Sequence, residues 1–506
     1  MLGFKEITKT NGFDFTNPIN ARQNNYAWSM SDLGDYIYVG TGRNIISNIL
    51  YLIEPAIRLP AMVNPGPMDN LGEIWRYKKD GTLPWTRVYK AQTGSGIAGF
   101  RYMVRHSPFS GSPCLYAAAI GAKVKVLKST NGVNWYEVPD TVLQGASSRA
   151  MVSHRGKLYI ATLDEMNQGG LSYLYSSEDP EFYPWEPVID YNDPDYNPYR
   201  NPSGPISNMA VFNNKIYVAV SSENGVEIWR TNKDEPRLND WTLVSNNGFG
   251  DPANKYSLSM GVFGNYLYVS GTKQLPLSWA IPRGCDVARI DKYDNLQLVV
   301  GGSSIIPGHK KKCSDNKSLS GLKSGFNNPF NVYAWQIQEY QGRLLISTFD
   351  DSINMEVILY TLLANRQALE RLIGDTAVKV LILIYKTIVK LLRSIRYPFG
   401  FDLYSSGDGV NFYPVFLDGL NNPYNYGGRI LYVDRCNDLY VGTANPFQGC
   451  EVWKATDEVL YDLETCHENH YKNLWEVRNI IEENYSTLEE NLQAISKILP
   501  RGYYLG

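Results

Sequence analysis

A short strand pattern recurs along the chain and constrains the fold more than any other feature of the sequence. Each copy has a polar turn, then two or three apolar residues, usually around a tyrosine, and then small residues. Each copy also pairs with a short apolar stretch beside it, as expected for two strands joined by a tight turn. The seven copies are GDYIYVGTG (34–42), SPCLYAAAI (112–120), RGKLYIATL (155–163), NNKIYVAVS (213–221), GNYLYVSGT (264–272), QGRLLISTF (341–349) and CNDLYVGTA (436–444).

Two further strand-like segments follow the copies, such as EIWRY (73–77) and WTRVYK (85–90) after the first. Four short strands per unit, at a minimum spacing of about 43 residues, are typical of the blades of a β-propeller. The seventh unit lacks its fourth strand after Lys454, and FKEITKTNGFDF (4–15) aligns with the fourth strand and exit loop at 241–252. We therefore predict an all-β fold, a seven-bladed β-propeller over about 1–456, closed by its N-terminal strand.

The loops that leave the fourth strands share a second signature. NGFGDPAN (247–254), SGFNNPFN (324–331) and DGLNNPYN (418–425) are near-copies, and NGFDFTNPIN (11–20) is a stretched version. Glycine permits a positive φ and proline fixes the following turn, so the motif predicts a loop that redirects the chain to the next blade. A direct role in ligand binding is the alternative.

Two turns between third and fourth strands carry a further motif. KSTNGVNWYEV (128–138) and SSGDGVNFYPV (405–415) resemble the Asp-box hairpin of sialidase-like propellers, and YKKDGTLPWTRV (77–88) is a degenerate copy. The resemblance implies a propeller fold and structural roles for Asn131 and Asp408. It does not imply sialidase activity, because YAWSM (26–30) stands where those enzymes carry a Phe-Arg-Ile-Pro segment.

Helical insertions are predicted after the second strands of blades one and six, at about 44–70 and 352–398. The first contains a short helix that ends before Pro55, and the second contains one helix over Asn354 to Ile373 and another over Thr376 to Arg396. In a propeller these loops rise from one face, and blades one and six both flank blade seven. We expect the two insertions to form an apolar lid over the central pocket.

The second helix of the later insertion is apolar over most of its circumference. Lys379, Lys386, Lys390 and Arg393 form one narrow cationic stripe on it. Such a helix either packs against the rest of the protein or lies in a membrane interface, where this stripe and Leu383 would contact lipid. Both interpretations remain open.

The C-terminal segment, about 457–506, is predicted to form a helical tail packed on the propeller. Docking along the propeller and coiled-coil association between copies of the chain are the two alternatives. The apolar positions have near-heptad spacing and are Leu474, Val477, Ile481, Leu488, Leu492, Ile495 and Leu499, with Tyr485 in the gap.

Polar and charged residues gather where the first strands begin and the second strands end, which is where a pocket mouth is expected. Asp164, Glu165 and Asp350 are candidate catalytic acids or bases, and arginines there could bind an anionic group. In the alternative interpretation these side chains form a solvated rim. The candidate ligand-binding residues are Tyr26, Arg43, Arg101, Arg149, Asn208, Glu223, Lys273, Tyr333, Arg429 and Asn445.

Composition excludes several classes of function. The formal charge of −3 over 506 residues argues against nucleic acid as a partner. No uncharged apolar run of membrane-spanning length is present, and the first residues do not resemble a signal peptide, so we expect a cytoplasmic protein, with peripheral membrane contact as an option. We predict no metal site: Cys466, His467 and His470 are interpreted as structural. No cofactor motif is present, and the cofactor is unknown.

These features favour a propeller that binds an apolar or amphiphilic small molecule beneath the lid, with or without catalysis. A non-catalytic interaction platform, with homo-oligomers formed through the insertions or tail, is the first alternative. A hydrolase or lyase acting on a saccharide is the second, and it requires two suitably spaced carboxylates.

Overall fold

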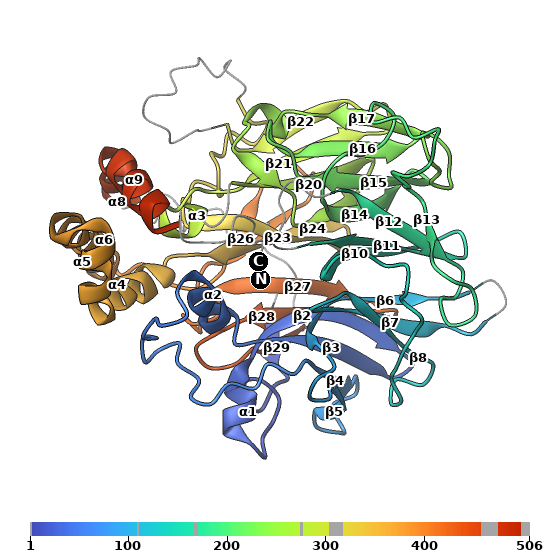
Figure 1. The fold of residues 1–506 in the computed structure, drawn as a ribbon, viewed down its shortest axis with the longest axis horizontal. Coiled ribbons are helices and arrows are strands. Elements are labelled where there is room, and N and C mark those ends of the chain that lie inside the picture. Colours follow the sequence, from blue (N-terminus) through green and yellow to red (C-terminus); the bar gives the residue numbers. More distant parts are fainter. Residues whose placement is uncertain are drawn as a thin grey trace.

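Four-stranded antiparallel units follow one another along the chain in the computed structural model, which describes residues 3–108, 111–164, 171–273, 277–302, 317–456 and 474–496 (Figure 1). Neighbouring strands in each unit are joined by the turns that the repeat predicts. The first two units are β2 (Asn24–Leu33), β3 (Tyr36–Arg43), β4 (Glu73–Lys78) and β5 (Thr86–Lys90), followed by β6 (Ile97–His106), β7 (Cys114–Gly121), β8 (Lys125–Ser129) and β9 (Tyr136–Glu137).

The next three units have the same order. Their strands are β10 (Ser147–His154), β11 (Lys157–Leu163), β12 (Tyr173–Ser177) and β13 (Glu186–Pro187); β14 (Ile206–Phe212), β15 (Lys215–Val220), β16 (Glu227–Thr231) and β17 (Trp241–Ser245); and β20 (Tyr266–Lys273), β21 (Asp286–Asp291) and β22 (Leu296–Val300). In the last of these, the first strand is divided into β18 (Asn254–Tyr256) and β19 (Met260–Phe263), which both pair with β20.

The remaining strands form the last two units, in which the N-terminal strand pairs with the last strand as predicted. They are β23 (Asn331–Tyr340), β24 (Arg343–Asp350), β25 (Leu403–Ser406) and β26 (Tyr413–Phe416), then β27 (Gly427–Val433), β28 (Leu439–Ala444) and β29 (Val452–Ala455). The N-terminal strand β1 (Phe4–Glu6) pairs antiparallel with β29, with Phe4 opposite Ala455. The Ile7 N–H continues the ladder by donating to the Val452 carbonyl at 2.9 Å.

The first strands of the units surround one central cavity. Side chains from β2, β6, β10, β14, β19, β23 and β27 all line it. Strand units arranged radially, with their first strands around a central channel, are the architecture of a β-propeller. The sequence prediction of a propeller agrees with this arrangement.

Apolar side chains fill the space between neighbouring sheets. Along β15, Ile216 and Val218 pack against the preceding unit, whereas Tyr217 and Ala219 pack against the following one. Successive side chains of a strand point to opposite faces, so a strand with a sheet on each side needs apolar residues at every position. This explains why the repeat is continuously apolar and does not alternate with polar residues.

Each exit loop is held by one asparagine, which is the last residue of the motif in three copies and lies four residues after the stretched copy 11–20 in the other. The side-chain amide of this asparagine donates to the carbonyl of the second motif residue and to an acidic residue at or next to the start of the third strand. Asn24 donates to Gly12 (2.9 Å) and Glu73 (3.0 Å), and Asn254 donates to Gly248 (2.9 Å) and Asp286 (2.8 Å). Asn331 donates to Gly325 (3.1 Å) and Asp402 (2.7 Å), and Asn425 donates to Gly419 (3.0 Å) and Glu451 (2.6 Å). The motif therefore acts as a structural clasp within each unit.

The two turns that resemble Asp-boxes are closed by their own polar side chains. Asp408 Oδ1 accepts from the N–H groups of Val410 and Asn411, both at 2.8 Å. Although burial raises it, these donors lower the pKa of Asp408 to about 2. Asn131 accepts in the same way from Val133 and its neighbour, at 2.9 Å. Both side chains serve the turn, as the resemblance implies.

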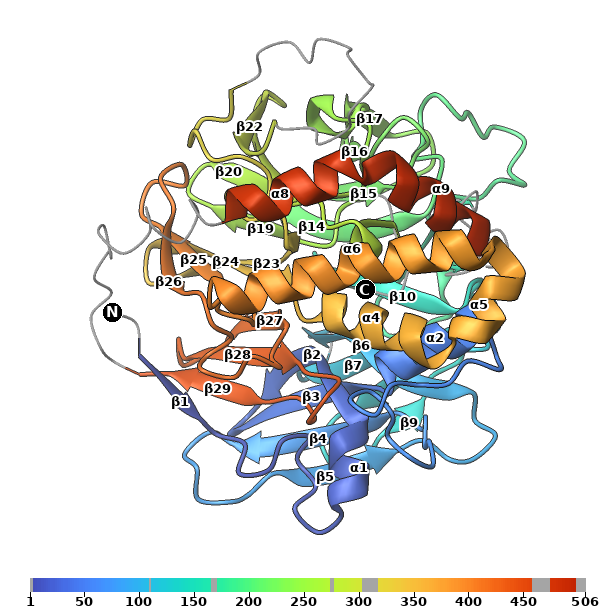
Figure 2. The same ribbon diagram turned by 90° about the vertical axis from the view of Figure 1, so that its left-hand side faces the viewer.

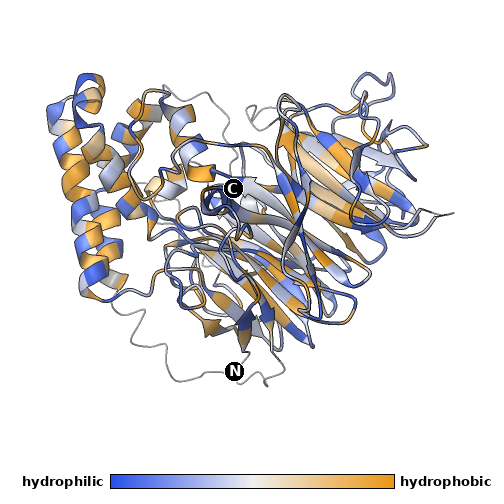
Figure 3. Ribbon diagram, turned by 90° about the horizontal axis from the view of Figure 1, so that it is seen from below, coloured by the Kyte–Doolittle hydropathy of each residue, from blue (hydrophilic) through white to orange (hydrophobic). Residues whose placement is uncertain are grey.

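A layer of helices covers one face of the strands (Figure 2). Apolar and polar residues alternate along these helices (Figure 3), so their apolar sides can face inward. The layer contains α2 (Ile45–Ile53), α4 (Asn354–Ala364), α5 (Arg366–Ile373) and α6 (Asp375–Ser394), together with α8 (Leu474–Glu483) and α9 (Tyr485–Ser496). Shorter helical turns elsewhere are α1 (Pro18–Gln23), α3 (Leu277–Ala280) and η1 (Gly248–Gly250).

The later insertion differs from the prediction in one respect. The single helix predicted over Asn354 to Ile373 is wrong, because the chain breaks at Asn365 into α4 and α5. The Asn365 side chain bonds the first insertion instead: Oδ1 accepts from the Arg58 N–H at 2.8 Å and Nδ2 donates to the Arg58 carbonyl at 3.0 Å. The two insertions therefore meet, as their positions in blades one and six predict.

The central helix α6 is held between other elements. Its buried side chains, among them Leu381, Ile388 and Leu392, pack with residues of α4 and with Val477 and Ile481 of α8. The described part of the tail, 474–496, thus docks on the insertion; Leu499 lies outside the described residues. No described helix is both long enough and apolar enough to span a bilayer.

Candidate functional site

The first strands of the units carry irregularities close to the cap end of the channel. At each one, a single residue has no opposite partner on the second strand, which is the pattern of a β-bulge. A bulge bends its strand and redirects its side chain. The residues at these positions are Trp28, Arg101, Arg149, Ser207, Trp335 and Arg429. We call these six side chains the bulge ring.

The bulge ring borders a cavity of about 390 Å³ in the centre of the propeller. Arg101, Arg149, Ser207, Trp335 and Arg429 all line it, and no acidic residue is among its described lining residues. A volume of this size is within the range of small-molecule sites. Three guanidinium groups from three different units therefore converge on one ligand-sized space.

All three arginines of the bulge ring are buried, and two of them, Arg101 and Arg429, stack on tryptophans. Arg101 is 1% exposed, and Arg149 and Arg429 are each 8% exposed. The Arg101 guanidinium carbon lies 4.8 Å from the Trp28 ring centre, and that of Arg429 lies 5.3 Å from the Trp335 ring centre. Stacking of a guanidinium on an indole orients the charge without neutralising it.

Burial and mutual repulsion act together on these groups. Burial lowers the pKa of Arg101, and the charges of Arg149 and Arg429 lower it further. Burial and the Arg149 charge also lower the pKa of Arg429 to about 9. Among the described residues, the Arg429 guanidinium has no hydrogen bond or ion pair, and its Nε is buried without a partner. An anion in the cavity would stabilise all three charges.

The cap end of the channel is filled by aromatic side chains. Tyr26 and Tyr426 share a hydrogen bond between their hydroxyl groups, and Tyr333 stacks on Phe349 at 4.8 Å. Trp279 donates to the Tyr333 hydroxyl from the side of α3. Residues of α2 and α4 pack directly on this cluster. Tyr26 and Tyr333, predicted as ligand-binding residues, therefore separate the cap from the cavity.

Two of the predicted second-strand residues lie in buried ion-pair networks. Arg43 is 3.4 Å from Glu73 and donates to Asn24 Oδ1 at 2.5 Å. Lys273 pairs with Asp286 at 2.8 Å and with a second aspartate at 2.7 Å. In both units the cation neutralises the acid of the exit-loop clasp. Neither residue reaches the central cavity, because the second strand lies one position farther from the axis.

In the unit of β23 and β24, the position equivalent to Arg43 and Lys273 is occupied by a carboxylate, Asp350. Asp350 accepts from the Ser352 N–H at 2.9 Å and from the Tyr397 hydroxyl. The clasp acid Asp402 lies close enough for its pKa to be raised by Asp350, after the larger effect of burial. Burial also raises the pKa of Asp350. Asn328 Nδ2 joins the group by donating to the Tyr397 hydroxyl at 2.8 Å.

The other predicted residues are dispersed. Asn208 lines the cavity, and Asn445 supports a loop by accepting from Gln448 N–H at 2.9 Å. Glu223 is exposed in a turn and Asp164 is exposed after β11. Glu165 lies outside the described residues, as do Cys466, His467 and His470. Within the described ranges, no group of three or more metal-ligating side chains is present.

The predicted membrane-contact residues lie on the outer side of α6. Leu383 is 64% exposed, and Lys386 and Lys390 are exposed beside it. The other two cations are paired: Lys379 with Asp375 at 2.6 Å and Arg393 with Glu356 at 2.8 Å. The cationic stripe is therefore on the surface, and the apolar side of the helix faces the protein.

Trp28 and Trp335 are site residues that the sequence analysis missed. They follow Tyr26 and Tyr333 by two positions, and a regular strand would place them on the same side. The bulges change this relationship, so that the tyrosines enter the aromatic cluster and the tryptophans flank the arginines. The sequence signal was the presence of Trp or Arg within five of the first strands.

Comparisons with known proteins give only distant likenesses. The sequence matches no protein-family model and no curated protein. The WD40 β-propeller domain of Doa1 is 8% identical over 90% of this chain and 98% of that chain, with a TM-score of 0.44. Acylaminoacyl peptidase of Pyrococcus horikoshii is 8% identical over 86% and 52%, with a TM-score of 0.40. A putative 6-phosphogluconolactonase from Bacteroides uniformis is 10% identical over 64% and 79%, with a TM-score of 0.37.

Proposed function

We propose that this protein is a seven-bladed β-propeller, with its ring closed by β1, that binds a small organic anion in its central cavity. The convergence of Arg101, Arg149 and Arg429 on one cavity of about 390 Å³ is the observation that carries the proposal. Guanidinium groups bind carboxylate and phosphate groups through charge-assisted hydrogen bonds. Carboxylates and phosphates are therefore the ligand groups that this site fits.

The energetics support a ligand role for the bulge ring. Three buried like charges are costly in the empty protein, since burial and repulsion both disfavour the charged forms. Arg101 donates to Ser147 Oγ at 3.2 Å, whereas the Arg429 Nε is buried without a hydrogen-bond partner among the described residues. Retention of costly charges is typical of functional sites. An anion would convert this cost into binding free energy.

The cavity wall also suits an apolar portion of the ligand. Met30, Met103, Met209, Met260 and Leu258 line the cavity together with serine and amide side chains. Methionine side chains adapt to irregular apolar shapes. An amphiphilic anion, with its head group at the bulge ring, fits this surface. The ligand position is then below the aromatic cluster and not directly beneath the cap.

Binding without catalysis fits the described lining better than hydrolysis of a saccharide. Glycosidase chemistry needs two carboxylates that face one cleft. Asp350 is bonded within the network of Tyr397 and Ser352, and Asp164 is exposed after β11. No described acid faces the cavity to act with the arginines.

Peripheral membrane contact through the cap is a second candidate. Leu383 projects from α6 beside Lys386 and Lys390, which make no ion pair with described residues. Apolar and cationic side chains on one helix face favour an anionic lipid surface. The neighbouring helix α8 exposes Glu482 and Glu483, which would weaken such contact. This candidate therefore stands behind anion binding.

Native mass spectrometry of the full chain, purified from its own host under gentle conditions, tests the main proposal. We expect a bound small molecule, and extraction of the same sample should yield an organic acid or phosphate ester. The variant Arg429→Gln should lose it, whereas Arg371→Gln, exposed on α5, should retain it. An apo mass in every sample, together with a bound protein, would favour the interaction-platform alternative.

A further inference from the structure

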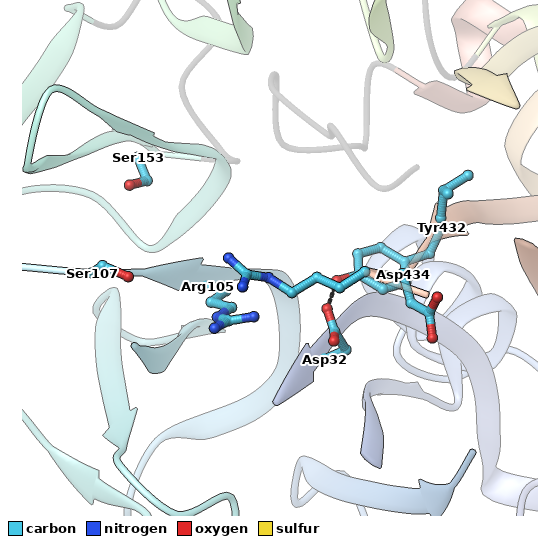
Figure 4. A pocket seen from close by; sticks show the side chains of 8 residues that line it. Asp32, Arg105, Ser107, Ser153, Tyr432 and Asp434 are labelled. Carbon is cyan, nitrogen blue, oxygen red and sulfur yellow. Dashed lines mark hydrogen bonds between the residues drawn. The ribbon is translucent and has the colours of Figure 1, made fainter. Parts of the chain in front are cut away.

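A second cavity lies at the end of the channel that faces away from the cap. It has a volume of about 340 Å³ and is lined by residues from the ends of the first strands (Figure 4). Asp32, Arg105, Ser153, Tyr432 and Arg435 are among its lining residues. We call it the far-face pocket.

The two acids of the far-face pocket share one lysine. Lys79 Nζ is 2.8 Å from Asp32 and 3.0 Å from Asp434, and the Tyr432 hydroxyl donates to Asp32 at 2.6 Å. Figure 4 shows Asp32 beside Tyr432 and Asp434, with Arg105 facing them across the pocket. Asp32 and Asp434 carry two negative charges, and Lys79, Arg105 and Arg435 carry three positive ones, so the pocket and Lys79 together have a net charge of +1.

Arg105 is the group in this pocket that an anion would meet. No hydrogen bond or ion pair joins its guanidinium to another described residue, and its Nε is buried without a partner. Arg435 lines the same pocket and is exposed, with no ion pair in the described part of the chain. Ser107 provides a neutral hydroxyl donor beside them, whereas the Ser153 hydroxyl is bonded to His106 Nδ1 at 2.8 Å. Guanidinium and hydroxyl groups together form a second anion-binding surface.

The far-face pocket continues the central cavity. Arg105 and Tyr432 line both spaces, so the two cavities follow one another along β6 and β27. Arg101 and Arg105 stand four residues apart on β6, which corresponds to about 13 Å of strand. Met103 lies between them and lines the cavity wall. The channel thus has guanidinium groups at two levels with an apolar side chain between.

We propose that the ligand is an elongated molecule with an anionic group at each end, of the linear diacid class, which enters from the far face. One end binds the bulge ring and the other binds Arg105, with Arg435 at the entrance. The inference rests on the proposed anion-binding function and adds the length, the second charge and the direction of entry. Entry from the cap side would require the aromatic cluster of Tyr26, Tyr333 and Tyr426 to separate.

Isothermal titration calorimetry with a series of linear dicarboxylates tests the proposal. The probes are succinate, adipate, suberate, sebacate and dodecanedioate, each compared with the monocarboxylate of equal length. We expect affinity to peak at one of the longer diacids and to exceed that of its monocarboxylate by about tenfold or more. Arg105→Gln should remove this advantage of the diacid, whereas Arg429→Gln should weaken diacid and monocarboxylate alike.

Three controls keep the outcomes distinct. Arg371→Gln changes the net charge by the same amount on the cap side and should match the wild type. Ser153→Trp should slow association of the best diacid in stopped-flow measurements, because it narrows the far-face pocket. Thermal unfolding of each variant verifies that it is folded.

Two results would overturn the proposal in different ways. Equal affinity for diacids and monocarboxylates, with Arg429→Gln still weakening the binding of both, would argue against the second subsite. The proposed anion-binding function would then stand. Absence of binding for every carboxylate in folded wild-type protein would count against both.

Discussion

The guanidinium carbon of Arg101 lies 4.8 Å from the centre of the Trp28 ring, and both side chains occupy bulges on neighbouring first strands. The pair joins two units at the level of the central cavity. Arg429 and Trp335 repeat the arrangement at 5.3 Å. The bulges are therefore the local feature that creates the site, because they direct large side chains into a channel that regular strands would fill differently.

Neutralising one arginine of the bulge ring should stabilise the empty protein. In Arg429→Gln, a buried charge that repels Arg101 and Arg149 is removed, so the free energy of unfolding should rise by about 0.5–2 kcal/mol. Urea denaturation without ligand measures the change, with Arg371→Gln as the control. A clear loss of stability would show that the guanidinium is a structural group and would weaken the binding proposal.

Stability should depend on pH through Asp350 and Asp402. Burial raises the pKa of both carboxyl groups, and the charge of Asp350 adds to the effect on Asp402. A raised folded-state pKa means that the folded protein binds protons more tightly than the unfolded chain, so this stability is complete below the ordinary pKa of about 4 and is lost as the pH rises through the raised values.

The variant Asp402→Asn isolates this effect. It keeps the shape of the side chain near Asn331 and Tyr404 and removes one charge. Urea denaturation between about pH 5 and pH 9 should show a flatter profile and a higher stability at the alkaline end than the wild type. The exposed substitution Asp195→Asn should leave the profile unaltered. A profile for Asp402→Asn as steep as the wild-type profile would contradict the expectation.

Loss of an exit-loop clasp should be costly. Asn425→Ala removes the hydrogen bonds to the Gly419 carbonyl and to Glu451, and leaves a buried carboxylate with one donor fewer. We expect the free energy of unfolding to fall by about 1–3 kcal/mol. Thermal and urea denaturation measure it, and Asn134→Ala, an exposed asparagine in a turn, should change stability by less than about 0.5 kcal/mol.

The N-terminal strand should stabilise the whole ring if it closes the propeller. Ile7→Pro removes the N–H that donates to the Val452 carbonyl, and deletion of residues 1–8 removes β1 entirely. Both variants should unfold in one cooperative transition at a lower urea concentration, whereas Ile7→Val should resemble the wild type. A separate early transition confined to the last unit would argue against a cooperative closed ring.

Peripheral membrane contact makes a distinct prediction. Vesicles containing phosphatidylserine should carry the protein upward in a flotation gradient, and the double substitution Lys386→Glu and Lys390→Glu should abolish flotation. A matched pair of exposed changes away from α6, Lys233→Glu and Lys292→Glu, should have a much smaller effect. If wild-type protein remains at the bottom of the gradient, the cap serves packing alone.

Much of the architecture could be read from residues near one another in sequence. The strand pairs, the pairing of β1 with β29 and the helix over Thr376 to Arg396 follow from turn chemistry, apolar patterns and motif alignment. Arg101, Arg149 and Arg429 were among the ten candidate ligand-binding residues, and the structure places all three at one cavity. Arg43, Lys273 and Asp350 were placed at the same mouth, but they belong to networks farther from the axis, because the second strand of each unit lies outside the first.

Sequence alone determined the repeating unit, since a turn, a tyrosine and a run of small residues act within a few residues of one another. It also determined the exit loop, because the asparagine and glycine of the clasp belong to one motif in three of the four copies. Tertiary structure decided which side chains share a space. Trp28 and Arg101 are far apart along the chain and meet because both strands bulge at the same height of the channel. Such a meeting depends on strand register and bulge position, which are set by packing between sheets.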